Sequence, residues 1–270
     1  MSPLFSPQEG NFKLIRFRDI RTFQFIGIPY ANKPERFTYA TMYNGSTIVD
    51  ATAFGLQCVQ SSNPGVLAGF TSENCLFLNI YTPFLPQGPV SKPSLKPVMF
   101  WIHGGSFMTG SGSMYPGGNL ASRGDVIVVT INYRLSTLGF LALNDGKTNG
   151  NYGISDQILA LDWVREHIVD FGGDPDRITI FGESAGAASV RALMASPKAF
   201  GKFAASISMS NPAGSNIAST YSNYLSIPQE VALAANPILK NTGCDTASDT
   251  LACLRAFDPY LLNALPDLAR

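Results

Sequence analysis

Two runs of almost uninterrupted apolar residues stand out along the chain, at residues 98–102 (VMFWI) and 126–131 (VIVVTI). Residues 178–181 (ITIF) form a third run, which is apolar and partly β-branched. Strands with one face in water alternate apolar and polar residues, whereas runs without alternation are typical of strands covered on both faces. These runs therefore predict the central strands of a mostly parallel sheet with helices on both faces.

Weaker patterns predict the elements around these strands. Apolar residues recur every three or four positions over residues 151–171, which predicts a helix. Two more helices are expected at residues 228–240 and 248–257. Further strands are expected at residues 12–28, 76–81 and 204–209. Glycine, proline and serine predict loops at residues 61–72, 83–97 and 108–119. Strands that alternate with helices in this way indicate an α/β fold.

Length and charge narrow the class of protein. With 270 residues the chain is long enough for one α/β domain with a substantial core. Its formal net charge is zero and 14% of its residues are charged, so we expect neither a nucleic-acid partner nor a charged tail. The apolar runs are much shorter than a membrane span, so no stable membrane insertion is expected. The opening residues, MSPLFSPQEGNF, lack the basic and apolar segments of a signal peptide.

A candidate nucleophile lies where a predicted strand meets a predicted helix. Residues 178–181 lead into Gly182-Glu183-Ser184-Ala185-Gly186, and small apolar residues that predict a helix follow from Ala185. A serine between glycines at a strand-to-helix turn is the pattern of a nucleophile elbow, in which a Cβ at either glycine would clash. The Ala185 N–H is then placed to hold a developing oxyanion. The alternative is a serine in a glycine-rich turn without a catalytic role.

A second glycine-rich segment, His103-Gly104-Gly105-Ser106-Phe107, directly follows the run at residues 98–102. Adjacent glycines let consecutive backbone N–H groups turn toward one point, which is a shape that binds anions. Ligands of parallel sheets bind beyond the C-terminal ends of the strands, where both this segment and the elbow are expected. The segment is therefore a candidate oxyanion loop. The alternative is an ordinary glycine-rich turn.

Several other segments, together with these two motifs, match a known family. They run nearly from end to end: Gly27-Ile28-Pro29-Tyr30-Ala31, Ser72-Glu73-Asn74-Cys75-Leu76, Asn132-Tyr133-Arg134, Gly150-Asn151-Tyr152-Gly153, Asp156-Gln157, Ala160-Leu161, Trp163-Val164 and residues 171–190. With them the chain resembles the type-B carboxylesterases and lipases, the group that includes the cholinesterases, and fungal-type members are the most similar. The resemblance implies an α/β-hydrolase fold.

The resemblance also implies roles for the residues of both motifs. Ser184 matches the nucleophile, and Gly105, Ser106 and Ala185 match the three oxyanion donors, which act through backbone N–H groups. Position 106 is usually glycine in the family and is serine here. The backbone N–H of residue 106 can still act as a donor if the φ angle at this position is one that a non-glycine residue can adopt. The implied substrate is a small-molecule or lipid ester, and the implied reaction needs neither a metal nor a cofactor. The oligomeric state is not indicated.

The four cysteines are compatible with two disulfides, although their number alone also fits buried thiols. The resemblance implies the pairs Cys58–Cys75 and Cys244–Cys253, and it implies an ion pair between Arg36 and Glu73 beside the first pair. Disulfides indicate a secreted or luminal protein, in spite of the missing signal peptide. Asn44 begins an Asn-Gly-Ser sequon, which is a glycosylation site if the chain is secreted.

The base that would activate Ser184 has no counterpart in the sequence. The order in α/β-hydrolases is serine, acid and then histidine, but the only histidines, His103 and His167, both precede Ser184. We interpret His103 as structural and His167 as a helix-end residue, with a catalytic role as the less favoured alternative for each. Glu183 matches a buried glutamate that supports the site. The later acids match no family motif: Glu230, Asp245, Asp249, Asp258 and Asp267.

The family's chain continues past the point where this one stops. We therefore expect residues 1–270 to be the N-terminal portion of one incomplete α/β-hydrolase domain, with the triad acid and histidine elsewhere and an uncovered sheet edge. On this view the 270-residue chain alone has negligible steady-state turnover. The alternatives are a catalytically inactive fragment and an esterase-like binding module, since the family includes adhesion relatives that keep the fold without the triad.

Overall fold

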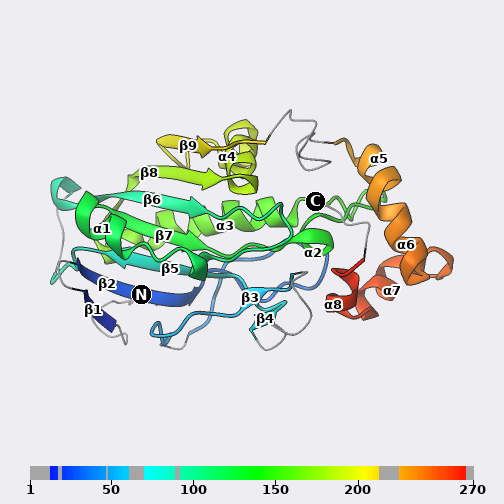
Figure 1. Ribbon diagram of the computed structural model, residues 1–270, viewed down its shortest axis with the longest axis horizontal. Coiled ribbons are helices and arrows are strands. Elements are labelled where there is room, and N and C mark those ends of the chain that lie inside the picture. The colour runs from blue at the N-terminus through cyan, green and yellow to red at the C-terminus, as the bar shows by residue number, and fades with distance from the viewer. Residues whose placement is uncertain are drawn as a thin grey trace.

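A seven-stranded sheet with the order β1-β2-β5-β7-β6-β8-β9 forms the centre of the molecule (Figure 1). The structure is a computed structural model that describes residues 13–17, 20–46, 48–60, 70–88, 92–212 and 225–265. The strands are β1 (Lys13–Phe17), β2 (Ile20–Pro29), β5 (Phe77–Thr82), β6 (Lys96–Ile102), β7 (Ile127–Ile131), β8 (Gly173–Glu183) and β9 (Ala205–Met209). A small separate sheet joins β3 (Gln57–Cys58) to β4 (Thr71–Ser72).

The sheet is parallel where the sequence has its longest apolar runs. β6 pairs in parallel with β7 and β8, and β8 pairs in parallel with β9. β1, β2, β5 and β7 pair antiparallel. The central parallel strands are thus confirmed, and the strand-like stretch predicted at residues 12–28 is present in its described part as two antiparallel strands, with a reversal that the sequence did not indicate. Both strands of such a pair carry the same loose alternation, so the pattern does not show where the chain reverses.

Helices cover both faces of this sheet. On one face, α1 (Gly118–Gly124) packs against a small cluster that includes Val128 of β7. On the other face, α3 (Tyr152–His167) and α4 (Ala185–Ala195) enclose the larger core, to which Val129 belongs. Neighbouring residues of β7 therefore face opposite helical layers, which explains its run without alternation. The sequence predicted no helix at α1, because the glycines before it indicated a loop.

The C-terminal helices lie together at the end of the molecule toward which β6 and β8 point (Figure 1). The helices predicted at residues 151–171, 228–240 and 248–257 are present. Ser226 and Gln229 form a capping box that begins the second of these. The remaining helices are α2 (Ser136–Phe140), α5 (Ile227–Glu230), the π-helical turn η6 (Val231–Ala235), α6 (Asn236–Thr242), α7 (Thr250–Ala256) and α8 (Pro259–Leu262). Short 3₁₀ turns are η1 (Lys92–Ser94), η2 (Gly112–Met114), η3 (Ile168–Phe171), η4 (Pro197–Ala199) and η7 (Cys244–Thr246).

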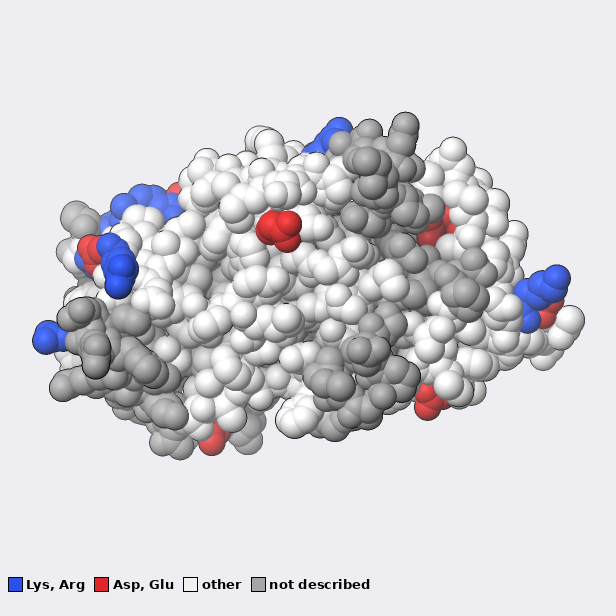
Figure 2. Space-filling model, in the orientation of Figure 1, with Lys and Arg blue, Asp and Glu red and all other residues white. Residues whose placement is uncertain are grey.

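The edge of the sheet at β9 is less covered than its centre. All five residues of β7 are buried, whereas in the edge strand β9 Ile207 is 44% exposed and Met209 is 37% exposed. Charged side chains are sparse over the middle of the face shown in Figure 2. Among the described residues, no helix has the length and apolar content needed to cross a membrane.

Candidate active site

Ser184 lies in a sharp turn between β8 and α4. Its backbone angles are φ 54° and ψ −119°, a combination that residues with a side chain rarely adopt. The turn is held on both sides, because the Ser184 N–H donates to the Met209 carbonyl at 3.0 Å and the Ser184 carbonyl accepts from the Ala188 N–H at 3.0 Å. This strained strand-to-helix turn is the geometry of a nucleophile elbow.

The two glycines of the elbow have no room for a side chain. A Cβ on Gly182 would lie 2.5 Å from the carbonyl oxygen of Gly186. A Cβ on Gly186 would lie 2.1 Å from the carbonyl oxygen of Ile102 at the end of β6. Both distances are far inside van der Waals contact, so α4 approaches β6 this closely only because both residues are glycines.

The oxyanion loop, residues 103–107, turns three successive residues into positive φ. The φ angles are 108° at Gly105, 57° at Ser106 and 58° at Phe107. The Thr109 N–H donates to the Gly105 carbonyl at 3.0 Å, and the Ser136 N–H donates to the Phe107 carbonyl at 2.6 Å. A serine adopts the left-handed region at a cost of about 1 kcal/mol. The loop therefore accommodates a non-glycine residue at position 106 and keeps its backbone N–H.

The oxyanion loop and the elbow touch each other. A Cβ on Gly104 would lie only 3.2 Å from the Cβ of Ser184. Within the described parts of the chain, the backbone N–H groups next to this contact donate to no protein acceptor; they belong to Gly105, Ser106 and Ala185. Backbone donors left open beside a hydroxyl are what a developing oxyanion requires. The structure thus brings the sequence-predicted nucleophile and donors into one place.

Neither histidine forms a hydrogen bond with Ser184. The His103 ring is fully buried, its Nδ1–H donates to the Gly104 carbonyl at 2.8 Å, and it stacks on Tyr133 with 4.3 Å between ring centroids. Burial lowers the pKa of His103 to about 4, so this imidazole is neutral at pH 7. His167 lies at the end of α3 against Trp163, 4.6 Å between ring centroids, and burial lowers its pKa as well. Both contacts are those of structural side chains.

Glu183, the last residue of β8, is exposed. The resemblance predicted a buried glutamate at this position, so that part of the prediction is wrong for the described chain. The physical reason is its place at the open end of β8, where the described residues cover the side chain only in part; its Oε2 would lie 3.1 Å from a Cβ on Gly104. Its backbone is nevertheless fixed, because Glu183 pairs with Met209 in the parallel ladder of β8 and β9.

Two residues that hold the oxyanion loop carried no functional signal of their own in the sequence. The Tyr133 hydroxyl donates to the His103 carbonyl at 2.7 Å, and burial raises the pKa of that hydroxyl. Ser136, at the start of α2, supplies the N–H that binds the Phe107 carbonyl. Both follow β7, which lies beside β6 in the sheet. Only this tertiary neighbourhood identifies them, because nothing in their spacing points to the loop.

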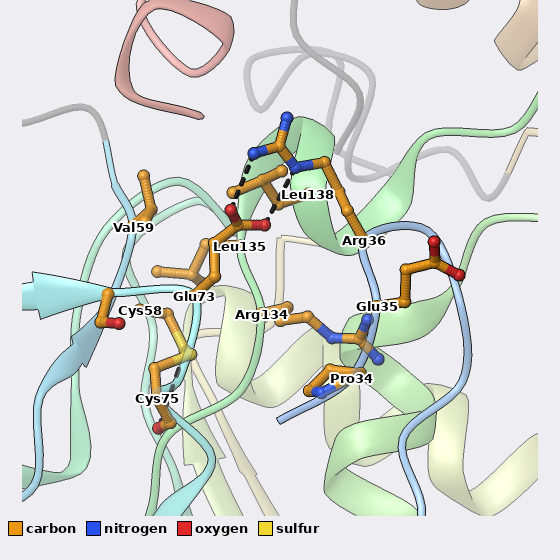
Figure 3. Close-up of a pocket in the computed structure, with 11 residues that line it drawn as sticks. Pro34, Glu35, Arg36, Cys58, Val59, Glu73, Cys75, Arg134, Leu135 and Leu138 are labelled. Carbon is orange, nitrogen blue, oxygen red and sulfur yellow. Dashed lines mark hydrogen bonds and ion pairs between the residues drawn. A yellow bond between two sulfur atoms is a disulfide. The ribbon is translucent and has the colours of Figure 1, made fainter. Parts of the chain in front are cut away.

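Arg36 connects the region of the Cys58–Cys75 disulfide with the C-terminal end of α7, and Figure 3 shows its ion pair with Glu73. Its guanidinium donates to both carboxylate oxygens of Glu73, at 2.9 and 2.7 Å, and it also donates to the carbonyls of Leu254 and Phe257 at 2.8 and 2.7 Å. The Arg36 side chain is 8% exposed. The pair is therefore a partly buried, bidentate ion pair that also caps the C-terminal end of α7, rather than two solvated charges.

Both cysteine pairs implied by the resemblance are disulfides in the structure. Cys58 and Cys75 are joined with an S–S distance of 2.05 Å, next to Glu73. Cys244 and Cys253 are joined with an S–S distance of 2.00 Å, between η7 and α7. Among the described residues there is no free cysteine. Loops closed in this way lose conformational freedom in the unfolded chain, which stabilises the fold by a few kcal/mol, about 3 for the longer loop.

A second ion pair holds the start of α2 and α3 together. Arg134 donates to both carboxylate oxygens of Asp156, at 2.8 and 2.7 Å, and to the Thr38 carbonyl at 2.7 Å. Asp156 also accepts from the Arg134 backbone N–H at 3.1 Å. Burial acts to lower the pKa of Arg134, but the charge and the hydrogen bonds of the Asp156 carboxylate outweigh it and raise that pKa. This network fixes the segment between β7 and α2 that supplies Tyr133 and Ser136.

The remaining candidate residues have ordinary places in the fold. Asp249 and Asp258 cap the starts of α7 and α8, where their carboxylates accept backbone N–H groups. Asn44 is exposed, while Asp267 lies outside the described residues. In the part of the chain that the structure describes, no three His, Cys, Asp or Glu side chains are grouped as ligands for a metal ion.

Comparisons with known proteins agree with this geometry. The carboxylesterase family matches residues 9–264. Neuroligin-2 of Homo sapiens is 38% identical over 275 residues, covering 86% of this chain and 32% of its own length. Bile salt-activated lipase of Mus musculus is 40% identical over 249 residues, covering 88% and 39%. Para-nitrobenzyl esterase of Bacillus subtilis (strain 168) is 46% identical over 190 residues, covering 66% and 37%.

A solved structure of PNB esterase superimposes with a TM-score of 0.77 at 37% identity, over 93% of this chain and 50% of that chain. The sheet order, the helical layers and the elbow define the α/β-hydrolase fold. The chain belongs to the carboxylesterase family. It spans between about a third and a half of the relatives named here, from 32% to 50% of their lengths. The similarity to fungal-type members stays a prediction.

Proposed function

We propose that this chain carries the nucleophile and oxyanion hole of a serine carboxylic-ester hydrolase. The observation that carries the proposal is the contact between Gly104 and Ser184, with 3.2 Å between the Ser184 Cβ and a Cβ built on Gly104. This contact supports a reaction in which the hydroxyl of the strained turn acts beside the three open backbone N–H groups. The lipase and esterase relatives support the same reaction class.

In the proposed reaction the Ser184 oxygen attacks the ester carbonyl. The N–H groups of Gly105, Ser106 and Ala185 stabilise the tetrahedral oxyanion. The bond to the alcohol oxygen then breaks, the alcohol leaves with a proton, and water releases the acid from the acyl-serine. Because neither histidine reaches Ser184, the imidazole that moves these protons comes from outside this chain. The substrate is a small-molecule or lipid ester, and no metal or cofactor takes part.

We also propose that the protein is secreted and that Asn44 is glycosylated. Two disulfides support an oxidising compartment, and the sequon asparagine is exposed. Expression through a secretory pathway, followed by glycosidase treatment of the wild type and of Asn44→Gln, tests this. We expect the mass shift only for the wild type, and an unmodified Asn44 would refute the assignment.

The hydrolase proposal is tested with a p-nitrophenyl alkylphosphonate, which phosphonylates nucleophilic serines, in the presence of added imidazole that replaces the base missing from the chain. We expect slow, stoichiometric labelling of Ser184 in the 270-residue chain, found by mass spectrometry of peptides and absent in Ser184→Ala. Ser189→Ala is the matched control, because Ser189 lies on the same helix and is buried against Gln157. No label at Ser184 in folded protein would sink the proposal.

Steady-state turnover tests the missing base. Triad members account for most of the rate in such enzymes, and their removal leaves only about 10³–10⁴-fold over water. We therefore expect negligible turnover of a p-nitrophenyl ester by this chain alone. Robust hydrolysis that Ser184→Ala abolishes would show that a base within the chain acts on Ser184.

A second candidate function is a non-catalytic binding module with an esterase fold. The lack of any histidine bound to Ser184 favours it, as does the similarity to neuroligin-2. The phosphonate experiment separates the two, because a binding module has no need of a reactive Ser184. Labelling confined to Ser184 supports the hydrolase, whereas an inert Ser184 supports the binding module.

A further inference from the structure

A cavity of about 620 Å³ lies between α3, α4 and the start of α5. Small-molecule sites commonly have volumes of about 300–1,000 Å³. Ser184 and residues 104–106 do not line this cavity. The cavity therefore lies beside the candidate active site, shares Phe107 with the oxyanion loop, and contains neither Ser184 nor the proposed oxyanion donors.

The floor of this cavity is apolar. Phe107 is 5% exposed and Phe140 is 8% exposed, and their rings meet edge to face with 5.0 Å between centroids. Ile154 and Ile158 line it from α3, and Ala188 lines it from α4. A surface of aromatic, isoleucine and alanine side chains binds hydrocarbon by removing it from water.

The rim of the cavity carries positive charge. Arg191 on α4 and Lys198 on η4 line it and are exposed. The Lys198 Nζ lies 5.7 Å from the centroid of the Tyr39 ring, which also lines the cavity. Among the described lining residues Glu230 is the one acidic side chain, so basic side chains outnumber acidic ones there by two to one. The rim thus favours an anionic head group over a cationic one.

The floor of the cavity touches both parts of the candidate active site. Ala188 is one helical turn from Ser184, and its N–H binds the Ser184 carbonyl at 3.0 Å. Phe107 directly follows Ser106 in the oxyanion loop. A ligand in the cavity therefore contacts the helix and the loop that position the nucleophile and its donors.

We propose that this cavity binds an amphiphile with one alkyl chain and a carboxylate head, such as a fatty acid. The alkyl chain packs against Phe107, Phe140 and the isoleucines of α3, and the carboxylate lies at Arg191 and Lys198. The choice of a carboxylate among anions rests on the proposed function, because ester hydrolysis releases a carboxylic acid beside this cavity. Charge complementarity and the apolar floor stand without it.

Binding of laurate to the 270-residue chain tests the proposal, by calorimetry with the ligand in monomeric form. We expect one saturable site. Arg191→Gln and Lys198→Gln each weaken binding about threefold, as for an exposed ion pair. Ala192→Trp fills the cavity from α4 and weakens binding at least tenfold. Met194→Trp is the matched control, because Met194 lies on the same helix, is 62% exposed and does not line the cavity.

The head group and Ser184 provide the decisive comparisons. Dodecyltrimethylammonium, which has the same chain length, is expected to bind at least tenfold more weakly than laurate. Equal binding of the two, no saturable binding of laurate, or no effect of Ala192→Trp in folded protein would overturn the site. Ser184→Ala is expected to keep laurate binding, and a loss there would move the ligand to the nucleophile. An unreactive Ser184 with intact laurate binding would refute only the proposed hydrolysis.

Discussion

The chain holds two serines at positive φ on loops that touch, and it holds them by different means. Ser184, at φ 54°, is held by two backbone hydrogen bonds and by crowding between elements, because a Cβ on Gly186 would lie 2.1 Å from the Ile102 carbonyl oxygen of β6. Around Ser106, at φ 57°, Thr109 and Ser136 donate to the carbonyls on either side, and the crowding is within the loop, because a Cβ on Gly105 would lie 2.2 Å from the Thr109 carbonyl oxygen. The elbow is therefore a packed junction between α4 and β6, whereas the oxyanion loop is a hydrogen-bonded bend closed mainly on itself.

This difference indicates where substitutions are tolerated. In a packed junction the neighbouring backbone cannot move without separating α4 from β6, so an added methyl group affects the whole fold. In a hydrogen-bonded bend a side chain is accommodated when it points away, as Ser106 shows. Substitutions in the two loops should therefore separate clearly by size of effect.

Gly186→Ala should have the largest effect. The added Cβ would lie 2.1 Å from the Ile102 carbonyl oxygen. This oxygen belongs to the backbone of β6, so the clash can be relieved only by moving α4 away from the sheet. We expect the free energy of unfolding to fall by at least about 3 kcal/mol, measured by urea unfolding. Gly124→Ala in α1 is the control, since its Cβ would meet only side-chain atoms at 3.4 Å and should change stability by less than about 1 kcal/mol. Equal effects of the two would refute the packed junction.

Acid should destabilise the oxyanion loop through His103. Its folded pKa is about 4, below the ordinary 6.5, so the unfolded state takes up the proton first as pH falls. Stability from this group is complete above about pH 6.5 and declines by up to about 1.4 kcal/mol per pH unit toward pH 4, about 3 kcal/mol in total. Urea unfolding of the wild type and of His103→Phe at several pH values checks this. Parallel curves for the two proteins would contradict it.

Gly104→Ala should act on both loops at once. Its Cβ would lie 2.6 Å from the Glu183 carbonyl oxygen and 3.2 Å from the Ser184 Cβ, so the loops must move apart. We expect a loss of about 2 kcal/mol in unfolding free energy and at least tenfold slower phosphonate labelling of Ser184. A variant that is destabilised but labels at the wild-type rate would show that the contact supports the fold alone.

Ser106→Gly should have the smallest effect. Glycine relieves the φ of 57° but gives the unfolded chain more freedom, and the two contributions nearly cancel, leaving a change within about 0.5 kcal/mol. The backbone N–H remains, so the labelling rate of Ser184 should stay within about twofold if only the backbone acts as a donor. A tenfold lower labelling rate of Ser184 would instead indicate that the Ser106 hydroxyl takes part in the reaction.

Local patterns predicted much of the fold and both glycine-rich motifs. The hydrophobic pattern predicted β6, β7 and α3. Strands buried on both faces are uninterrupted apolar runs, and a helix with one buried face has apolar residues every three or four positions. The chain reversal between β1 and β2, helix α1 and helix α2 were missed. The apolar residues of β1 and β2 continue across the reversal without a break, and α1 and α2 have only seven and five residues, too few for a helical period to be recognised.

The candidate site divides in the same way. The sequence by itself determined the position of the candidate nucleophile, the glycines around it and the absence of a histidine between Ser184 and residue 270, because each is a property of residue type and order. Only the tertiary structure decided that Gly104 meets Ser184, that Tyr133 and Ser136 hold the oxyanion loop and that Glu183 is exposed. These depend on which strands become neighbours, and strand neighbours are set by packing of the whole sheet, which no local segment encodes.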